Sequence, residues 1–214
     1  MRERTLTARS TGPARRSSAV PARARRSVRR RRLVLAGLCA IAAAVAGYTI
    51  VRPLADDLLK EITLPLRHED IIRQQARDKG LDPALVAAII YRESRFRDVT
   101  SDAGAKGLMQ ILPATAEFIA RKSGGTRFEL RDLGNPQINI AYGCWYLRYL
   151  VQRYDGNTLA AVAAYNAGHD HVDAWGGSAL TLADIRFPET AQYTREVLEK
   201  RDDYAREYRR ELGL

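Results

Sequence analysis

The stretch Ala84-Leu85-Val86-Ala87-Ala88-Ile89-Ile90-Tyr91-Arg92-Glu93 decides the fold of this 214-residue chain. The two residues before it, Asp82 and Pro83, are typical of a helix N-cap followed by proline at the first helical position. The sequence therefore predicts a helix from about Pro83 to Ser94. Because the run is almost uncharged, a glutamate at its end has an unusual environment.

Glu93 is expected to be partly buried. Residues three, four, seven and eight positions before it share its face of the helix, and all are apolar: Leu85, Val86, Ile89 and Ile90. A carboxyl group in apolar surroundings keeps its proton to higher pH, as a general acid requires. The alternative is a glutamate at a helix end that only pairs with a neighbouring arginine, at position 92, 95 or 97.

Two further segments bear on this choice. A turn with glycines follows the helix, Ser101-Asp102-Ala103-Gly104-Ala105-Lys106-Gly107-Leu108-Met109-Gln110. Its glycines favour backbone conformations that other residues avoid and that let backbone approach a ligand. The second segment, Ala163-Ala164-Tyr165-Asn166-Ala167-Gly168, reads by itself as a helix end with Gly168 just past the last turn.

Together with Glu93-Ser94 and in this order, the segments 101–111 and 163–168 resemble the three signature segments of the soluble lytic transglycosylase (SLT) catalytic domain. The resemblance covers residues 71–195. It implies a mainly α, lysozyme-like domain that acts on the glycan strands of peptidoglycan and needs no metal or cofactor. Members of this family can also carry a small β-hairpin.

The resemblance also assigns roles to single residues. It makes Glu93 the sole catalytic acid and base, and Tyr165 a hydroxyl near its carboxylate. Gln110 and the 107–112 turn become a wall of the glycan groove. The residues that it assigns to substrate binding are Ser101, Gly107, Met109, Gln110, Leu112, Tyr165, Asn166 and Glu189. The alternative for Met109 is a core side chain.

The expected reaction cleaves the β-1,4 bond between N-acetylmuramic acid and N-acetylglucosamine. Glu93 would protonate the glycosidic oxygen and then accept the proton of the muramoyl C6 hydroxyl, which closes a 1,6-anhydro ring. The only other carboxyl groups near it in sequence, Asp98 and Asp102, have no counterpart in the catalytic set of the family. A hydrolytic muramidase and a non-catalytic wall-binding module are the alternatives. Dedicated secretion or cell-envelope machinery is a further partner that the sequence leaves open.

The positive charge lies in an N-terminal tail. Residues 1–32 hold twelve arginines and one acid, a net of +11, whereas the whole chain carries +10, so residues 33–214 carry about −1. By charge, the body is therefore not a nucleic-acid-binding surface. His169 and His171 have only Asp170 and Asp173 as nearby companions, which are fewer ligands than metal sites usually offer.

A membrane span is predicted directly after the tail. Residues 33–51 carry no charge and, as a helix, would be about 28 Å long, close to the hydrocarbon thickness of a bilayer. The arginines before it favour a signal anchor in the inner membrane, with the tail in the cytoplasm and the body outside. A cleavable signal peptide is the alternative, because Ala44-Val45-Ala46 precedes Gly47. A lipoprotein is disfavoured, since the large Leu38 precedes Cys39.

These features divide the chain into a disordered basic tail (1–32), a span (33–51), a linker (52–67) and a helical catalytic domain (68–214). Within the domain, helices are expected to begin at Pro113, after Asn135 and after Asn157, and a charged helix is expected over Thr190–Tyr208. In the second of these, apolar residues recur at helical spacing: Ile140, Cys144, Leu147 and Val151. With one cysteine in the span and one in this domain, no disulfide can form within the domain.

Overall fold

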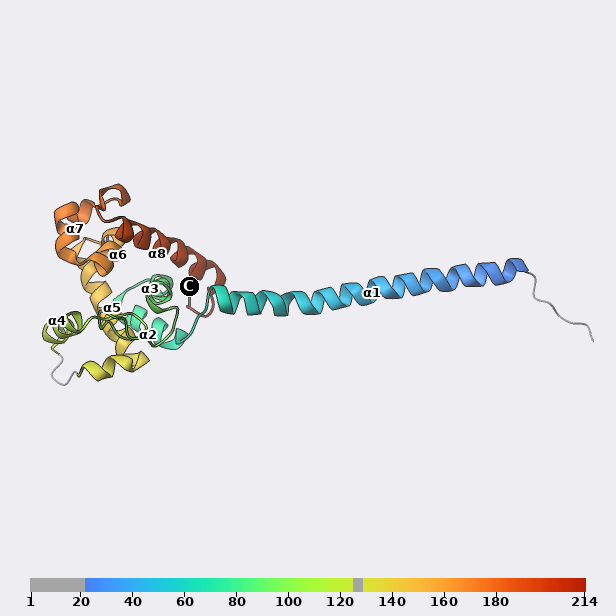
Figure 1. Cartoon of the computed structure of the whole chain (residues 1–214), viewed down its shortest axis with the longest axis horizontal. Coiled ribbons are helices and arrows are strands. Elements are labelled where there is room, and N and C mark those ends of the chain that lie inside the picture. Colours follow the sequence, from blue (N-terminus) through green and yellow to red (C-terminus); the bar gives the residue numbers. More distant parts are fainter. Residues whose placement is uncertain (1–21, 125–128) are drawn as a thin grey trace, which may run out of the picture. The chain divides into compact units, whose positions relative to one another are not determined.

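The computed structural model describes residues 22–124 and 129–214, so the first 21 residues of the predicted tail lie outside it. The chain forms two compact units, residues 1–57 and 58–214. The described residues form helices and no strand (Figure 1). These helices are α1 (Ala22–Thr63), α2 (Glu69–Lys79), α3 (Pro83–Ser94), α4 (Pro113–Ser123), η1 (Leu130–Gly134), α5 (Pro136–Arg153), α6 (Thr158–Ala167), α7 (His169–Trp175), η2 (Gly177–Ala179), η3 (Leu182–Asp184) and α8 (Pro188–Glu207).

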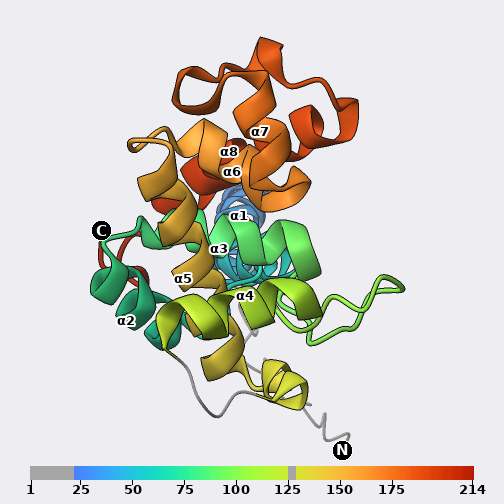
Figure 2. The same cartoon turned by 90° about the vertical axis from the view of Figure 1, so that its left-hand side faces the viewer.

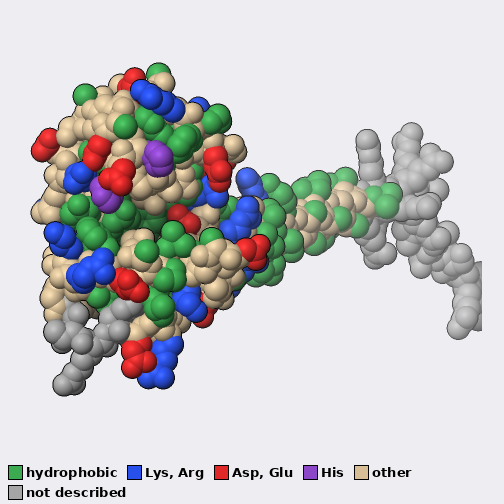
Figure 3. All heavy atoms as spheres, turned by 60° about the vertical axis from the view of Figure 1, so that its left-hand side comes forward, with side chains coloured by type: hydrophobic (Ala, Val, Ile, Leu, Met, Phe, Trp, Pro, Cys, Tyr) green, Lys and Arg blue, Asp and Glu red, His purple; other side chains and the backbone are tan. Residues whose placement is uncertain are grey.

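Helix α1 is longer than the predicted span. It takes in the end of the basic tail, residues 22–32, and most of the predicted linker, and it continues through Pro53. Its segment Leu33–Thr63 is long and apolar enough to cross a membrane by length and composition, and its large apolar side chains are exposed (Figure 3). A signal sequence has the same properties, so the choice between anchor and signal peptide stays open.

Helix α3 is the centre of the second unit and has the predicted bounds. It runs from Pro83 to Ser94, and the Asp82 side chain accepts a hydrogen bond from the Ala84 N–H at 2.8 Å. Every side chain from Ala84 to Ile90 is buried. Helices α2 and α8 pack against α3, and Figure 2 shows α6 and α7 on one side of it and α4 on the other.

The other predicted helices are present, with shifted ends. Asn135 and Asn157 cap α5 and α6 through their side chains, as predicted. On α5 the buried stripe ends at Leu150, whereas Val151 is only partly buried. Helix α8 begins at Pro188 rather than Thr190, because proline suits the first turn of a helix. On α5, complete burial also raises the pKa of the Cys144 thiol to about 12.

The turn between α3 and α4 is fixed by one buried amide. The Asn139 side chain accepts a hydrogen bond from the Met109 N–H at 2.8 Å and donates to the carbonyls of Lys106 and Leu133 at 2.9 and 3.0 Å. Only isolated bridges, Thr100 with Lys106 and Lys106 with Ile111, form in this turn, in place of a β-hairpin.

Gly107 is required at the point where the turn meets this amide. Its φ of +74° favours glycine. A Cβ atom there would also overlap the Asn139 amide and approach the Leu133 carbonyl oxygen to 2.6 Å. The glycine therefore lets the turn lie directly on the start of α5.

We expect Asn139→Ala to lower the free energy of unfolding by about 3 kcal/mol, because it leaves one N–H and two carbonyls in the interior without their partner. Urea unfolding of the detergent-solubilised chain, followed by tryptophan fluorescence, measures this. The control is Gln137→Ala on the exposed side of the same helix, which should change the value by less than about 0.5 kcal/mol. Equal effects of the two substitutions would contradict the role of the amide.

Candidate active site

Glu93 lies in the last turn of α3 and is held by a residue one hundred positions later. The Tyr193 hydroxyl on α8 donates a hydrogen bond to Glu93 Oε1 at 2.6 Å. Burial raises the pKa of Glu93 above its ordinary value of 4.5, whereas this hydrogen bond and the Arg92 charge act in the opposite direction. Burial is the largest of the three effects, so the carboxyl group has the property that a general acid needs.

Tyr193 is a fixed hydrogen-bond donor to this carboxyl group. It is buried, and both burial and the negative charge of Glu93 raise its pKa well above 10, so its hydroxyl keeps its proton. The Arg92 guanidinium lies over the Tyr193 ring, 5.3 Å from its centroid, and Arg92 Nε is 2.7 Å from Glu196 Oε2 on α8. These contacts join the end of α3 to α8 directly beside the acid.

Tyr165 approaches the same carboxyl group from α6. Burial and, next, the charge of Glu93 raise the pKa of Tyr165 well above its usual value. The Tyr165 hydroxyl donates to the Met109 carbonyl at 2.9 Å rather than to Glu93. This tyrosine therefore ties the turn between α3 and α4 to α6 next to the acid.

The end of that turn forms a small pocket beside Tyr165. Predicted groove residues Gln110 and Leu112 line it. The Gln110 side chain donates to the carbonyls of Val99 and Gly107 at 3.0 and 2.8 Å, and this fixes its orientation. The full lining is Gln110, Ile111, Leu112, Thr115, Tyr146 and Tyr165.

The remaining predicted binding residues are placed differently. The Ser101 hydroxyl accepts a hydrogen bond from the Ala105 N–H at 3.1 Å, within its own turn. Met109 is fully buried and meets Gly143 of α5, and Gly107 is buried on Asn139. Asn166 and Glu189 are exposed, and Asn166 accepts a hydrogen bond from Thr190. For all of these residues, contact with a glycan stays a prediction.

Neither nearby aspartate shares the environment of Glu93. Asp98 and Asp102 are exposed, and neither is among the groups that shift the Glu93 pKa. His169 and His171 lie on α7, where His171 stacks beside Trp175. Within residues 22–124 and 129–214, no three metal-ligating side chains lie close enough together to hold an ion.

Sequence reasoning missed two residues that organise this site. Tyr193 was not identified from the sequence, although the Thr190–Tyr193–Val197 spacing on α8 could have shown that it faces the core. Asn139 was passed over as a polar residue in an amphipathic helix. Its neighbours Ile140 and Gly143 are buried, so a polar residue there signals a buried hydrogen-bonding role.

Comparison with known proteins identifies a family. The model of the "Transglycosylase SLT domain" matches residues 70–187. The soluble lytic murein transglycosylase of Salmonella typhimurium is 35% identical over 164 residues, and the match covers 70% of this chain and 24% of that protein. The membrane-bound lytic murein transglycosylase C of Haemophilus influenzae is 38% identical over 108 residues, which are 46% of this chain and 30% of that protein.

Solved structures give the same result. The 70 kDa soluble lytic transglycosylase of Escherichia coli superposes with a TM-score of 0.64 at 32% identity, over 68% of this chain and 25% of that chain. An inactive glutamate-to-glutamine mutant of the lytic transglycosylase Slt from Pseudomonas aeruginosa superposes with a TM-score of 0.65 at 32% identity, and the match covers 70% of this chain and 26% of that chain. This chain spans about a quarter of the length of the soluble relatives it matches.

We expect Tyr193→Phe to raise the pKa of Glu93 further, because it removes the hydrogen bond that stabilises the carboxylate while burial remains. Carboxyl ¹³C chemical shifts followed against pH would measure this. The matched control is Tyr204→Phe on the same helix, whose hydroxyl donates to the Pro65 carbonyl and which should leave the Glu93 pKa unchanged. An unchanged or lowered pKa in Tyr193→Phe would contradict the described geometry.

Proposed function

This chain belongs to the transglycosylase SLT domain family, and we propose that it cleaves the glycan strands of peptidoglycan. The observation that carries the proposal is the Glu93 carboxyl group, which has a raised pKa, a hydrogen bond from Tyr193 and the Tyr165 hydroxyl group in its vicinity. The names of the relatives, soluble and membrane-bound lytic murein transglycosylases, support this substrate.

In the proposed reaction, Glu93 serves first as acid and then as base. Its protonated carboxyl group gives its proton to the glycosidic oxygen as the bond to muramic acid C1 breaks. The C6 hydroxyl of the same sugar then attacks C1 and gives its proton to the Glu93 carboxylate. The acid is thereby restored, no water is consumed, and the product carries a 1,6-anhydro ring.

The surroundings of Glu93 support the use of one carboxyl group. Hydrolytic glycosidases usually place a second carboxyl group about 5–9.5 Å from the acid, whereas an intramolecular hydroxyl needs no such partner. Asp98 and Asp102 are exposed and do not contribute to the Glu93 pKa shift. The Pseudomonas relative was solved as an inactive mutant with glutamate replaced by glutamine, in keeping with a single essential glutamate.

Substrate binding would use the small pocket beside Tyr165. Gln110, Leu112 and Tyr165 line this pocket, and the proposal extends to the other predicted residues of the groove: Ser101, Gly107, Met109, Asn166 and Glu189. The buried position of Met109 supports a role through its backbone, which holds Tyr165, rather than through its side chain. The Escherichia coli relative has been solved in complex with bulgecin A.

We expect Glu93→Gln to lower turnover of purified sacculi by at least about 100-fold, because it removes both proton-transfer steps. Mass spectrometry of the muropeptides released by the wild-type protein should find 1,6-anhydromuramoyl ends, which lack one water relative to hydrolysis products. Asp98→Asn and Asp102→Asn are the controls and should stay within about threefold of wild type. Glu189→Gln should weaken substrate binding more than it changes the chemical identity of the released product.

Reducing-end muramic acid as the main product, or a loss in either aspartate variant equal to that in Glu93→Gln, would assign the chain to the hydrolytic muramidases. The free energy of unfolding of Glu93→Gln, measured as a function of pH, shows whether this variant is folded. Because the folded-state pKa of Glu93 is raised, its contribution to stability is full below 4.5 and is lost as pH rises through the folded value. The glutamine variant lacks this loss, so its free energy of unfolding should fall less between acid and neutral pH.

We further propose that α1 anchors the domain on the outer side of the cytoplasmic membrane, as the arginine-rich tail favours. A C-terminal alkaline phosphatase fusion, which is active only outside the cytoplasm, should be active. Replacing Arg29-Arg30-Arg31-Arg32 by four glutamines should reduce that activity. N-terminal sequencing of the mature protein distinguishes the anchor from a signal peptide, since a mature chain beginning at Gly47 would contradict anchoring.

A further inference from the structure

A basic pocket lies where the end of α1 meets the turn after α3. Its volume is about 410 Å³, within the range of small-ligand sites. We call it the basic pocket, and its lining residues are Glu61, Ile62, Pro65, Arg67, Arg95 and Arg97. All of them belong to the second compact unit.

The three arginines of the basic pocket are available to an anion. Arg67, Arg95 and Arg97 are exposed, and none has an ion-pair partner within the described part of the chain. The Arg95 guanidinium lies over a tyrosine ring, and Arg97 Nε donates to a backbone carbonyl. With Glu61 as the one acid of the lining, the pocket carries a net charge of +2. A guanidinium group can donate two parallel hydrogen bonds to two oxygens of one phosphate, so this lining suits a phosphate ester.

An apolar surface borders the basic pocket. Leu58, Leu59 and Ile62 are 55%, 58% and 73% exposed. Leu58 and Ile62 are four residues apart and so lie on one face of the helix. Ile62 also lines the pocket, and therefore the apolar surface and the arginines are continuous.

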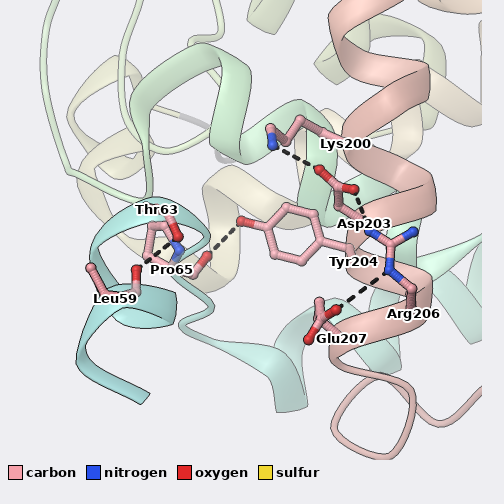
Figure 4. A network of polar contacts seen from close by, with 8 residues as sticks. All are labelled: Leu59, Thr63, Pro65, Lys200, Asp203, Tyr204, Arg206 and Glu207. Atoms are coloured by element: carbon pink, nitrogen blue, oxygen red, sulfur yellow. Dashed lines mark hydrogen bonds and ion pairs between the residues drawn. The ribbon is translucent and has the colours of Figure 1, made fainter. Parts of the chain in front are cut away.

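The opposite face of this helix end is attached to α8. Lys60 Nζ donates to the Glu207 carbonyl at 2.8 Å, and the Tyr208 hydroxyl donates to the Leu64 carbonyl at 2.7 Å. Figure 4 shows the Tyr204 hydroxyl directed to the Pro65 carbonyl, at 2.6 Å. These bonds fix residues 60–65 on the domain, so Leu58 and Ile62 stay directed away from its core.

We propose that the basic pocket and the Leu58–Ile62 face bind the surface of an anionic phospholipid bilayer. The arginines would hold headgroup phosphates, and the leucine and isoleucine side chains would enter the boundary of the acyl chains. Charge complementarity supports this occupant, as does continuity with α1, which is apolar enough to cross a membrane. The inference goes beyond glycan cleavage and rests on the proposed anchoring alone. Arg95 and Arg97 follow Glu93 by two and four residues, so the bound headgroup lies beside the end of α3.

Titration of the full chain in a neutral detergent tests the inference. The probes are dihexanoyl phosphatidylglycerol, dihexanoyl phosphatidylcholine and inorganic phosphate, and the readout is isothermal calorimetry. Phosphatidylglycerol should bind at least tenfold more tightly than either of the others. The variant Arg67→Gln/Arg95→Gln/Arg97→Gln should bind it on the order of 100-fold more weakly, because each basic residue near an anionic surface contributes roughly fivefold.

The control variant Arg121→Gln/Lys122→Gln/Arg131→Gln removes the same charge from exposed positions elsewhere and should bind like wild type. Near-ultraviolet circular dichroism of both variants confirms their fold. Equal affinity for the two lipids, or equal affinity of the two variants for phosphatidylglycerol, would overturn the proposal. If inorganic phosphate binds as tightly as phosphatidylglycerol, the ligand of the basic pocket is free phosphate and not a lipid. If the wild-type chain forms dimers, and if the variant Leu58→Ser/Ile62→Ser dissociates them but keeps its preference for phosphatidylglycerol, the apolar face binds a second copy of the chain instead of lipid.

Discussion

The burial of one ionisable carboxyl group constrains the rest of this structure. Glu93 is only partly exposed, because α2, α8 and the following turn pack on α3. Full desolvation without a partner would strongly disfavour the ionised form of the carboxyl group. The Tyr193 hydroxyl compensates in part, since it stabilises the carboxylate without bringing a positive charge into the site.

Small residues let the neighbouring helices and the turn pack closely on one another. Helix α6 contributes four buried alanines, Ala160, Ala161, Ala163 and Ala164, and α3 contributes Ala84, Ala87 and Ala88. Gly143 on α5 does the same for the turn, because a methyl group there would overlap Met109. With short side chains between the backbones, the polar groups of α6, α8 and the turn come within hydrogen-bonding distance of one another.

Local signals predicted the fold better than the site. Proline and N-cap residues fix helix starts through neighbouring backbone, so Asp82-Pro83, Asn135-Pro136 and Asn157 could be interpreted without tertiary information. The burial of Glu93 followed from helical spacing for the same reason. The hydrogen bond from Tyr193 to Glu93 joins residues 100 positions apart, and the bond between Met109 and the Asn139 side chain joins residues 30 positions apart. No periodicity in the sequence encodes such pairings. The buried side chain of Met109 likewise depends on Gly143, which lies thirty-four residues later.

The buried thiol of Cys144 has a consequence for maturation. In an unfolded chain a thiol has a pKa of about 8.5 and is open to oxidants, whereas the folded domain raises the pKa of Cys144 to about 12 and encloses it. Folding is therefore what protects this sulfur from oxidation. A domain exported to an oxidising compartment would need no disulfide catalyst, but it would have to fold before its thiol reacts, because Cys144 is fully buried in the folded domain.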